Sequence, residues 1–496
     1  MSITRRNLLE TGGLSAALLS MAGACSRQDQ VQSNDLAELD AVETASRIKS
    51  GALSGQEAVE AAIARAKRVD PKINAIVTKT FGDARKAAAE ANGVWGGVPT
   101  FVKDLDDVTG VRTAFGSRAF PGYRGGEQTP LIDAFLGLGV VSLGKSATPE
   151  FGLSATTEPI SSGKTRNPWN TDYSTGGSSG GAAALVASGV VPIAHASDGG
   201  GSIRIPASCC GNVGLKVSRG RYPAARPEDG VGPISLAVHG VQTRTVRDTA
   251  AVIAAMELPP EESGLAPVGL VSSPGDRQLK IGVAMTGLSG LSVDPRVATA
   301  TEGVATLCAD LGHAVEQVKL PVDLRITQDF QLYWAAFAHS AVKIWKETTH
   351  LPPNGFAFEP FTLGLSRYFE DHQGEFEGAI TRLQAIAPQM DEQIYSKYDV
   401  ILSPVVSAPP PKIGYLDGGM EYDDLLDRLL NYVQFTALYN ITGATGISLP
   451  LSMSPDGLPI GAMFGAKLGD EKTLLELAYE LEEAKPWSGR RPTVFG

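Results

Sequence analysis

The chain has 496 residues, of which 43% are hydrophobic and 20% charged, and its formal net charge is −11. This composition is typical of a soluble globular protein, and the length is sufficient for a large core around one extended sheet. Because the excess charge is negative and no lysine and arginine cluster occurs in the body of the chain, we expect no nucleic-acid partner.

The first 24 residues have the pattern of an export signal of the twin-arginine type. Arg5 and Arg6 precede a weakly apolar stretch that ends in small residues at Ala24. The alternative is an N-terminal helix that merely contains two arginines. Glu10 and two glycines make the stretch too polar for a membrane span. We therefore expect residues 1–24 to be a signal peptide and the protein to be periplasmic or exported.

The end of this signal admits two kinds of processing. Ala22, Gly23 and Ala24 fit the small-residue rule for simple cleavage. Cys25, which follows directly, is instead the residue that would carry a lipid and anchor the protein to a membrane. Alanine rather than leucine three residues before the cysteine favours simple cleavage. In either case residues 25–35 are expected to be a polar connector.

The other three cysteines predict neither disulfides nor a metal site. Cys209 and Cys210 are adjacent and Cys308 is remote in the sequence, so the spacing matches no disulfide framework and no zinc motif. The adjacent pair lies in an apolar setting, which favours small buried residues. We expect no metal and no cofactor.

Hydrophobic periodicity predicts an α-helical layer over residues 36–92, followed by an α/β region. Ser54 and Glu57 have the spacing of a capping box at the start of a helix. From Gly97 onward, short apolar runs that end in glycine or a charged residue predict buried strands alternating with helices. We therefore expect residues 36–496 to form one domain of the α/β class.

The segment from about Lys280 to Tyr395 contains most of the long-helix pattern. Large apolar side chains recur there at intervals of three and four residues, which predicts that they share one helical face. These are Phe330, Tyr333, Trp334, Phe337, Ile344 and Trp345. The face is interpreted either as a plain core stripe or as the wall of a substrate pocket.

Two glycine-rich serine clusters are the most informative feature of the chain. They read GGSSGG over residues 176–181 and DGGGSIRIPA over residues 198–207, and Ser178 and Ser202 lie 24 residues apart. Consecutive glycines allow backbone N–H groups to converge on an anion. A serine in such a nest indicates acyl-transfer chemistry, with Ser202 as nucleophile and its preceding amides as oxyanion donors.

The base for this chemistry is less obvious from the sequence. None of the six histidines has a recognisable catalytic context, and His195 lies on a strand-like run that favours a packed or hydrogen-bonded side chain. Lys103 closes an apolar strand and is followed by three aspartates, at positions 104, 106 and 107. Burial would lower the pKa of its amine and make it a general base. The alternative is a strand-end lysine paired with a neighbouring aspartate.

Together, the segments VPTFVKD, GGSSGG and DGGGSIRIPASCCGNVGLK resemble the amidase signature family of amide hydrolases. Further similar segments lie at Pro149–Glu158, Arg166–Asn170, Tyr398–Pro404, Phe435–Leu451 and Gly457–Phe464. The set is specific because it covers nearly all of the chain after the signal. It implies a large mixed, twisted β-sheet covered on both faces by α-helices. It also implies a catalytic core over about residues 90–250 and a variable helical pocket region over about residues 310–400.

The resemblance also implies roles for individual residues. Ser202 forms the acyl-enzyme, Ser178 follows a cis peptide bond and relays a proton, and Lys103 is the base in its neutral form. The oxyanion hole is formed by the N–H groups of Gly199, Gly200, Gly201 and Ser202. Ser179 and Ser154 are accessory hydrogen-bonding residues, and Arg204 and Asp198 brace the loop rather than contact substrate.

Three positions depart from the family pattern. Gly199 replaces a threonine or serine, the segment after Lys103 reads DLDDV, and Val217 replaces a proline. None of these changes affects Lys103, Ser178 or Ser202. They predict altered loop rigidity and pocket shape with the chemistry retained.

The predicted function is hydrolysis of the C–N bond of a small carboxamide. Aryl amides, peptide amides and carbamates are the candidate substrates, with ester hydrolysis as a side activity. No obligatory protein partner is expected, and the protein is predicted to be a monomer or homodimer. The pocket-forming helices lie outside the diagnostic motifs, so the sequence leaves the substrate open.

Three other interpretations conflict with features of the sequence. Residues 177–181 also satisfy G-x-S-x-G, but the nucleophile elbow of α/β-hydrolases directly follows a strand, and the preceding RNPWNTDYST is rich in turn residues. A glutamine-hydrolysing amidotransferase subunit requires cytoplasmic partners, which conflicts with the export signal. A non-catalytic periplasmic binding protein conflicts with the intact set of Lys103, Ser178 and Ser202.

Overall fold

The structure is a computed structural model that describes residues 36–224 and 234–496. The predicted signal peptide, the polar connector and Cys25 lie outside the described residues. A small sheet contains β1 (Ile76–Lys79), β2 (Pro99–Lys103) and β3 (Val141–Ser146). Its order is β1-β3-β2, and β3 runs antiparallel to β1 and parallel to β2.

The larger sheet has eight strands. These are β4 (Ile193–Asp198), β5 (Val213–Lys216), β6 (Val238–Thr243), β7 (Lys280–Val283), β8 (Ala314–Gln317), β9 (Val400–Pro404), β10 (Thr445–Met453) and β11 (Pro459–Ala466). Their order is β4-β6-β5-β10-β11-β9-β7-β8. Neighbouring strands from β4 to β9 pair antiparallel, whereas β7 pairs parallel with β9 and β8. The sheet is therefore mixed, as predicted.

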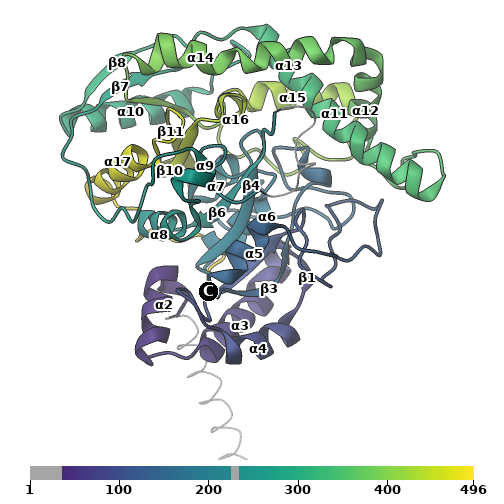
Figure 1. Cartoon of the computed structure of the whole chain (residues 1–496), viewed down its shortest axis with the longest axis vertical. Helices are drawn as coiled ribbons and strands as arrows, with labels where there is room; N and C mark the ends of the chain where they lie inside the picture. Colours follow the sequence, from purple (N-terminus) through teal and green to yellow (C-terminus); the bar gives the residue numbers. More distant parts are fainter. Residues whose placement is uncertain (1–35, 225–233) are drawn as a thin grey trace, which may run out of the picture.

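Helices cover the sheets and occupy both ends of the molecule. The N-terminal layer consists of α2 (Ala41–Ser50), α3 (Gly55–Ile73) and α4 (Phe81–Glu90). The others are α5 (Pro130–Gly137), α6 (Gly180–Ala187), α7 (Arg204–Cys210), α8 (Val246–Met256), α9 (Pro260–Ser263), α10 (Pro295–Asp310), α11 (Leu324–Thr349), α12 (Pro360–His372), α13 (Phe376–Gln384), α14 (Ile386–Met390), α15 (Tyr422–Tyr432), α16 (Ala437–Thr442) and α17 (Glu471–Ala484). Figure 1 shows α2, α3 and α4 at the lower end of the view and α11 to α15 at the upper end.

The start of α3 shows how local sequence sets an element. The Ser54 side chain accepts a hydrogen bond from the Glu57 N–H, and the Glu57 carboxylate accepts one from the Ser54 N–H. Two N–H groups without helical partners are thereby satisfied. The predicted capping box is confirmed.

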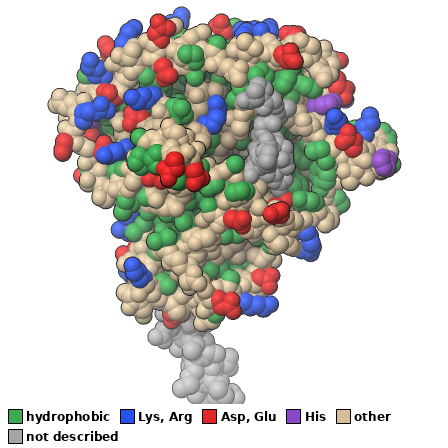
Figure 2. Space-filling model, viewed as in Figure 1, with side chains coloured by type: hydrophobic (Ala, Val, Ile, Leu, Met, Phe, Trp, Pro, Cys, Tyr) green, Lys and Arg blue, Asp and Glu red, His purple; other side chains and the backbone are tan. Residues whose placement is uncertain are grey.

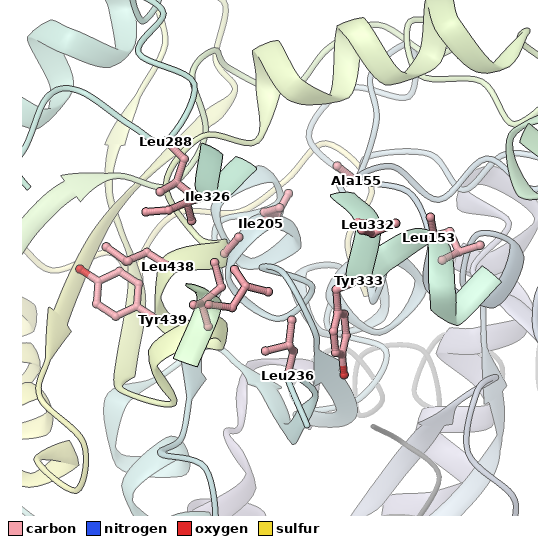
Figure 3. Close-up of a cluster of buried hydrophobic side chains, with 14 of the residues drawn as sticks. Leu153, Ala155, Ile205, Leu236, Leu288, Ile326, Leu332, Tyr333, Leu438 and Tyr439 are labelled. Carbon is pink, nitrogen blue, oxygen red and sulfur yellow. The ribbon is translucent and has the colours of Figure 1, made fainter. Parts of the chain in front are cut away.

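Both faces of the large sheet are buried, which confirms the predicted fold class. Adjacent strand residues point to opposite faces, and on β11 Met463 belongs to one hydrophobic cluster while Ala462 and Phe464 belong to another. The cluster with Met463 includes side chains of α11 to α16, and the other includes side chains of α8, α10 and α17. Figure 3 shows part of the first cluster, where Tyr333 and Tyr439 come from different helices.

The long helix α11 differs from the prediction of one shared apolar face. Tyr333 and Trp345 are buried, but Ile344 is 56% exposed. The buried positions change around the helix along its length, from Ile326 and Tyr333 near the start to Val342 and Trp345 near the end. The prediction of one apolar face along all 26 residues of the helix does not account for this change of packing partners.

Acidic and basic side chains are intermingled over the face shown in Figure 2. Among the described residues, no helix is both long and apolar enough to cross a membrane.

Cys209, Cys210 and Cys308 are free and buried, which confirms the interpretation of the adjacent pair as small core residues.

Candidate active site

The first serine cluster forms a tight loop before α6. The peptide bond between Gly177 and Ser178 is cis, as the resemblance implies. A Cβ atom built on Gly177 would lie 2.5 Å from the Thr156 carbonyl oxygen, so the close approach of two backbones requires glycine there. No strand precedes the loop in the described residues 166–177, where the backbone forms only two isolated bridges, from Arg166 to Ser174 and from Tyr173 to Lys412. The nucleophile-elbow interpretation is therefore wrong.

Lys103 ends strand β2 and points at this loop. Its Nζ atom donates hydrogen bonds to Ser178 Oγ at 2.7 Å and to Ser197 Oγ at 3.0 Å. Ser197 lies on β4, which a hydrogen bond of 3.0 Å from Thr100 Oγ1 to the Ile193 carbonyl oxygen ties to β2. No sequence motif predicts Ser197, because its place beside Lys103 depends on the packing of two strands that are 94 positions apart at these residues.

Burial changes the acidity of Lys103. The side chain is completely buried, and this desolvation lowers its pKa from 10.5 to about 7, although the charges of Asp106 and Asp198 act to raise it. In the described part of the chain, no carboxylate lies at salt-bridge distance from its amine, whose hydrogen bonds go to the two serines. The alternative of a strand-end lysine paired with an aspartate is therefore wrong, and the amine is poised near neutrality.

Arg204 and Asp198 hold the second serine cluster in place. The guanidinium donates to both Asp198 oxygens, from Nη2 at 2.9 Å and from Nε at 3.0 Å, and both side chains are buried. Asn440 Nδ2 donates to Asp198 Oδ1 at 2.9 Å. Burial acts to raise the pKa of Asp198, but Arg204 and Asn440 outweigh it and hold this pKa well below its usual value. The predicted bracing role of this pair is confirmed.

The glycine loop offers fewer oxyanion donors than predicted. The Gly201 N–H donates to Asp198 Oδ1 at 2.8 Å, so its prediction as an oxyanion donor is wrong. The carboxylate that braces the loop is a stronger acceptor than a neutral carbonyl and occupies this amide. The N–H groups of Gly199, Gly200 and Ser202 donate to no protein acceptor in the described part of the chain. These three amides remain candidates for the oxyanion hole.

The two clusters are joined through Ser179. Its N–H donates to the Ser202 carbonyl oxygen at 3.3 Å, and its Oγ donates to the Ser197 carbonyl oxygen at 3.1 Å. Ser202, Gly177 and Gly200 line one pocket, as does Ser154, and the volume of this pocket is about 100 Å³. The structure thus brings the predicted site residues to one region, with Ser179 between the two loops rather than at the pocket.

A cluster of polar groups lies behind Lys103. His195 Nε2 is 3.2 Å from His239 Nδ1, and His195 Nδ1 accepts a hydrogen bond of 3.4 Å from the Lys103 backbone N–H. Burial lowers the pKa of His195 to about 3. The imidazole is therefore neutral and hydrogen-bonded, which confirms that it is a packed histidine.

The same cluster offers ligand atoms for a metal ion. Within the described ranges, atoms of Asp106, His195 and His239 lie within 4.8 Å of one another. Burial acts to raise the pKa of Asp106, but the two histidines, Lys145 and Lys103 outweigh it and hold this pKa below its usual value. A divalent cation would have to displace this arrangement beside two amines. We therefore attribute the cluster to hydrogen bonding around Lys103.

Comparison with known proteins identifies the family. The amidase family model matches residues 57–475. The chain is a member of the amidase signature family. An amidase-signature hydrolase acts on amide bonds, and the mixed sheet described above is the architecture that this family shares.

Individual relatives agree with this assignment. A Mycobacterium tuberculosis protein assigned as an amidase, AmiC, is 44% identical over 457 residues, covering 91% of this chain and 96% of the relative. The 6-aminohexanoate-cyclic-dimer hydrolase of Paenarthrobacter ureafaciens is 34% identical over 478 residues, covering 92% and 97%. This amidase is therefore an enzyme that hydrolyses amide bonds.

Solved structures give the same result. A 6-aminohexanoate cyclic dimer hydrolase complexed with substrate superposes with a TM-score of 0.84 at 31% identity and covers 93% of this chain and 100% of its own. A bacterial aryl acylamidase of the amidase signature family superposes with a TM-score of 0.81 at 26% identity, covering 91% and 99%.

Proposed function

We propose that this amidase cleaves carboxamides through an acyl-enzyme on Ser202, with Ser178 as proton relay and Lys103 as base. The observation that carries the proposal is the contact between Lys103 Nζ and Ser178 Oγ at 2.7 Å, made by a buried amine whose pKa is lowered to about 7. A neutral amine at this place accepts a proton, whereas an ordinary lysine would remain protonated at neutral pH.

The proposed steps use the contact of Lys103 with Ser178 and the position of Ser202 at the pocket. The Ser202 hydroxyl passes its proton to Ser178 as Ser178 passes its own to Lys103, and Ser202 Oγ bonds to the amide carbon. The negative charge that develops on the carbonyl oxygen is stabilised by the free amides of the glycine loop. The tetrahedral intermediate collapses as the proton returns through Ser178 to the leaving nitrogen, and the C–N bond breaks. Water then attacks the ester by the same relay and releases the acid.

A fluorophosphonate probe tests the assignment of the nucleophile. The wild-type protein should be labelled at Ser202, and Ser202→Ala should lose both labelling and amide hydrolysis. Ser179→Ala is the matched control, because this serine lies in the adjacent loop and contacts backbone groups only. It should keep labelling and a measurable share of activity. Labelling that persists in Ser202→Ala and disappears in Ser179→Ala would refute the proposed roles.

The substrates we propose are aryl amides, peptide amides and carbamates, with esters as a side activity. The structural support is a pocket beside Ser202 with aromatic walls, formed by Phe330 and Trp334. A panel of these compounds, measured from pH 6 to 10, should show turnover of at least one amide that rises toward alkaline pH. An acidic optimum would contradict the role of Lys103.

We also propose that residues 1–24 direct export by the twin-arginine route. The support is the sequence pattern of Arg5 and Arg6 followed by a weakly apolar stretch. A reporter fused to residues 1–35 should leave the cytoplasm, and the double variant Arg5→Lys, Arg6→Lys should stay inside. Arg27→Lys is the control. Mass spectrometry of the exported N-terminus then separates simple cleavage from lipidation at Cys25.

A further inference from the structure

Among the described residues, those that line the pocket beside Ser202 include no charged side chain. Its walls come from several helices and loops and include Leu288, Phe330, Trp334, Leu365, Leu429 and Val433. The polar members are serines, Thr327 and Gln331. A charged group placed here would lose its hydration without gaining an ionic partner.

Three hydrogen-bond donors of the wall are already used by the protein. Gln331 Nε2 donates to the Tyr422 hydroxyl at 3.1 Å, and Thr327 Oγ1 donates to the Leu288 carbonyl oxygen at 3.2 Å. Trp334 Nε1 donates to a backbone carbonyl oxygen at 3.3 Å. These three donors are therefore not free to solvate a charged substituent.

The apolar wall begins directly at the reacting groups. The rings of Phe330 and Trp334 are stacked with their centroids 5.6 Å apart. A Cβ atom built on Gly200 would lie 3.0 Å from the Phe330 ring, and one built on Gly199 would lie 3.4 Å from Trp334. A substituent next to the scissile amide therefore meets aromatic surface before it meets solvent.

Helix α15 presents a second apolar surface to the pocket. Leu426, Leu429 and Val433 recur at intervals of three and four residues and line it. The exposed Asp423 and Asp424 precede them on the same helix and are not part of the lining. Leu153, Ala155, Ile205 and Leu288 line the same pocket and belong to the buried hydrophobic cluster drawn in Figure 3.

From this we infer that the amidase acts on amides whose group next to the scissile bond is uncharged and apolar, and that it rejects isosteric substrates charged at the same place. The inference rests on the proposed function, since it assumes that the pocket beside Ser202 receives the substrate. It also disfavours glutamine as a substrate, because both charges of its zwitterionic head would enter the pocket uncompensated.

Rigid isosteric substrates test this selectivity. Anilides of 4-ethylbenzoate, 4-(aminomethyl)benzoate and terephthalate differ only in the charge at one fixed position on a ring that cannot bend toward solvent. We expect kcat/KM for the ethyl compound to exceed that of either charged compound by about 100-fold or more. A second series with the same substituents on the aniline ring of acetanilides shows which side of the amide the pocket holds. Equal rates within both series would overturn the inference.

A charge placed in the pocket should reverse the preference. Gln331→Glu is isosteric and puts a carboxylate in the wall, so it should raise kcat/KM for the aminomethyl compound relative to the ethyl compound by about tenfold. Gln328→Glu is the matched control, because Gln328 is exposed on the same helix and does not line the pocket. An unchanged ratio in a Gln331→Glu protein that is still labelled by the fluorophosphonate probe would overturn the inference.

Failure of the proposed function has a different signature. If no probe labels Ser202 and unsubstituted acetanilide is not hydrolysed, the catalytic assignment is wrong. If labelling and acetanilide hydrolysis are present but charged and neutral substrates react alike, only the selectivity is wrong.

Discussion

Replacing Lys103 by methionine should abolish activity and, at neutral pH, stabilise the fold. The native amine is completely buried, and its pKa falls from 10.5 in the unfolded chain to about 7 in the native state. As the pH falls from 10.5 to about 7, the unfolded chain therefore takes up a proton that the native state does not. Wild-type stability is lost over this range and stays level below it.

The magnitude follows from the two pKa values. At about 1.4 kcal/mol per pKa unit, the fall from 10.5 to about 7 corresponds to about 5 kcal/mol. Methionine removes this penalty but also loses the hydrogen bonds to Ser178 and Ser197, at about 1 kcal/mol each. Lys103→Met should therefore be less stable than wild type by about 2 kcal/mol above pH 10.5 and more stable by about 3 kcal/mol at pH 7.

Unfolding of both proteins by denaturant, or by heat at one scan rate, at pH 7 and pH 10 checks this change of sign. Lys86→Met is the control, because the Lys86 side chain is 83% exposed and its replacement should shift stability equally at both pH values. A difference between Lys103→Met and wild type that does not depend on pH would refute the reasoning. The kcat/KM of the wild-type protein should rise with increasing pH, with a midpoint near pH 7. A kcat/KM that falls as the pH rises through this midpoint would refute the reasoning independently.

Three further changes probe the scaffold around the site. Gly201→Ala should lower kcat by about 100-fold or more, because the new side chain would displace the glycine loop. The φ angle of Gly201 is +134°, and a Cβ atom there would lie 2.3 Å from Thr436 Oγ1. A kcat equal to that of the wild type would contradict this. Arg204→Met should cost about 3–5 kcal/mol of unfolding free energy, since Asp198 is left buried and unpaired; a denaturant midpoint equal to that of wild type would exclude it. Burial and the charge of Glu150 raise the pKa of Glu359, so the wild type loses stability as the pH rises and this carboxyl must ionise. Glu359→Gln should therefore gain stability relative to wild type as the pH rises from 5 to 9. A difference in Tm that is constant with pH would contradict this.

The parts of the site that the sequence predicts are those written in short continuous segments. Lys103, Ser178 and Ser202 each lie in a local motif with its own glycine or charge pattern, and the capping box at Ser54 depends on four neighbouring residues. The mixed sheet is also predictable, because buried strands and glycine-ended runs alternate along the chain.

What the sequence does not predict depends on tertiary packing. Ser197 reaches Lys103 only because β4 lies beside β2. The Gly201 amide is lost as an oxyanion donor only because Asp198 folds back onto its own loop. On α11, the exposure of Ile344 depends on which element packs against each turn of the helix.

The acidity of Lys103 is a balance between burial and two carboxylates that do not touch its amine. Burial lowers the pKa, and the charges of Asp106 and Asp198 raise it. Without the carboxylates the amine would be a weaker base, and with a direct ion pair it would stay protonated at neutral pH. Arg204 and Asn440 donate hydrogen bonds to Asp198, which hold its carboxylate in place and partly neutralise its charge. Neither of these two residues lines the pocket beside Ser202. The residues that brace the glycine loop therefore also help to set the pKa of Lys103.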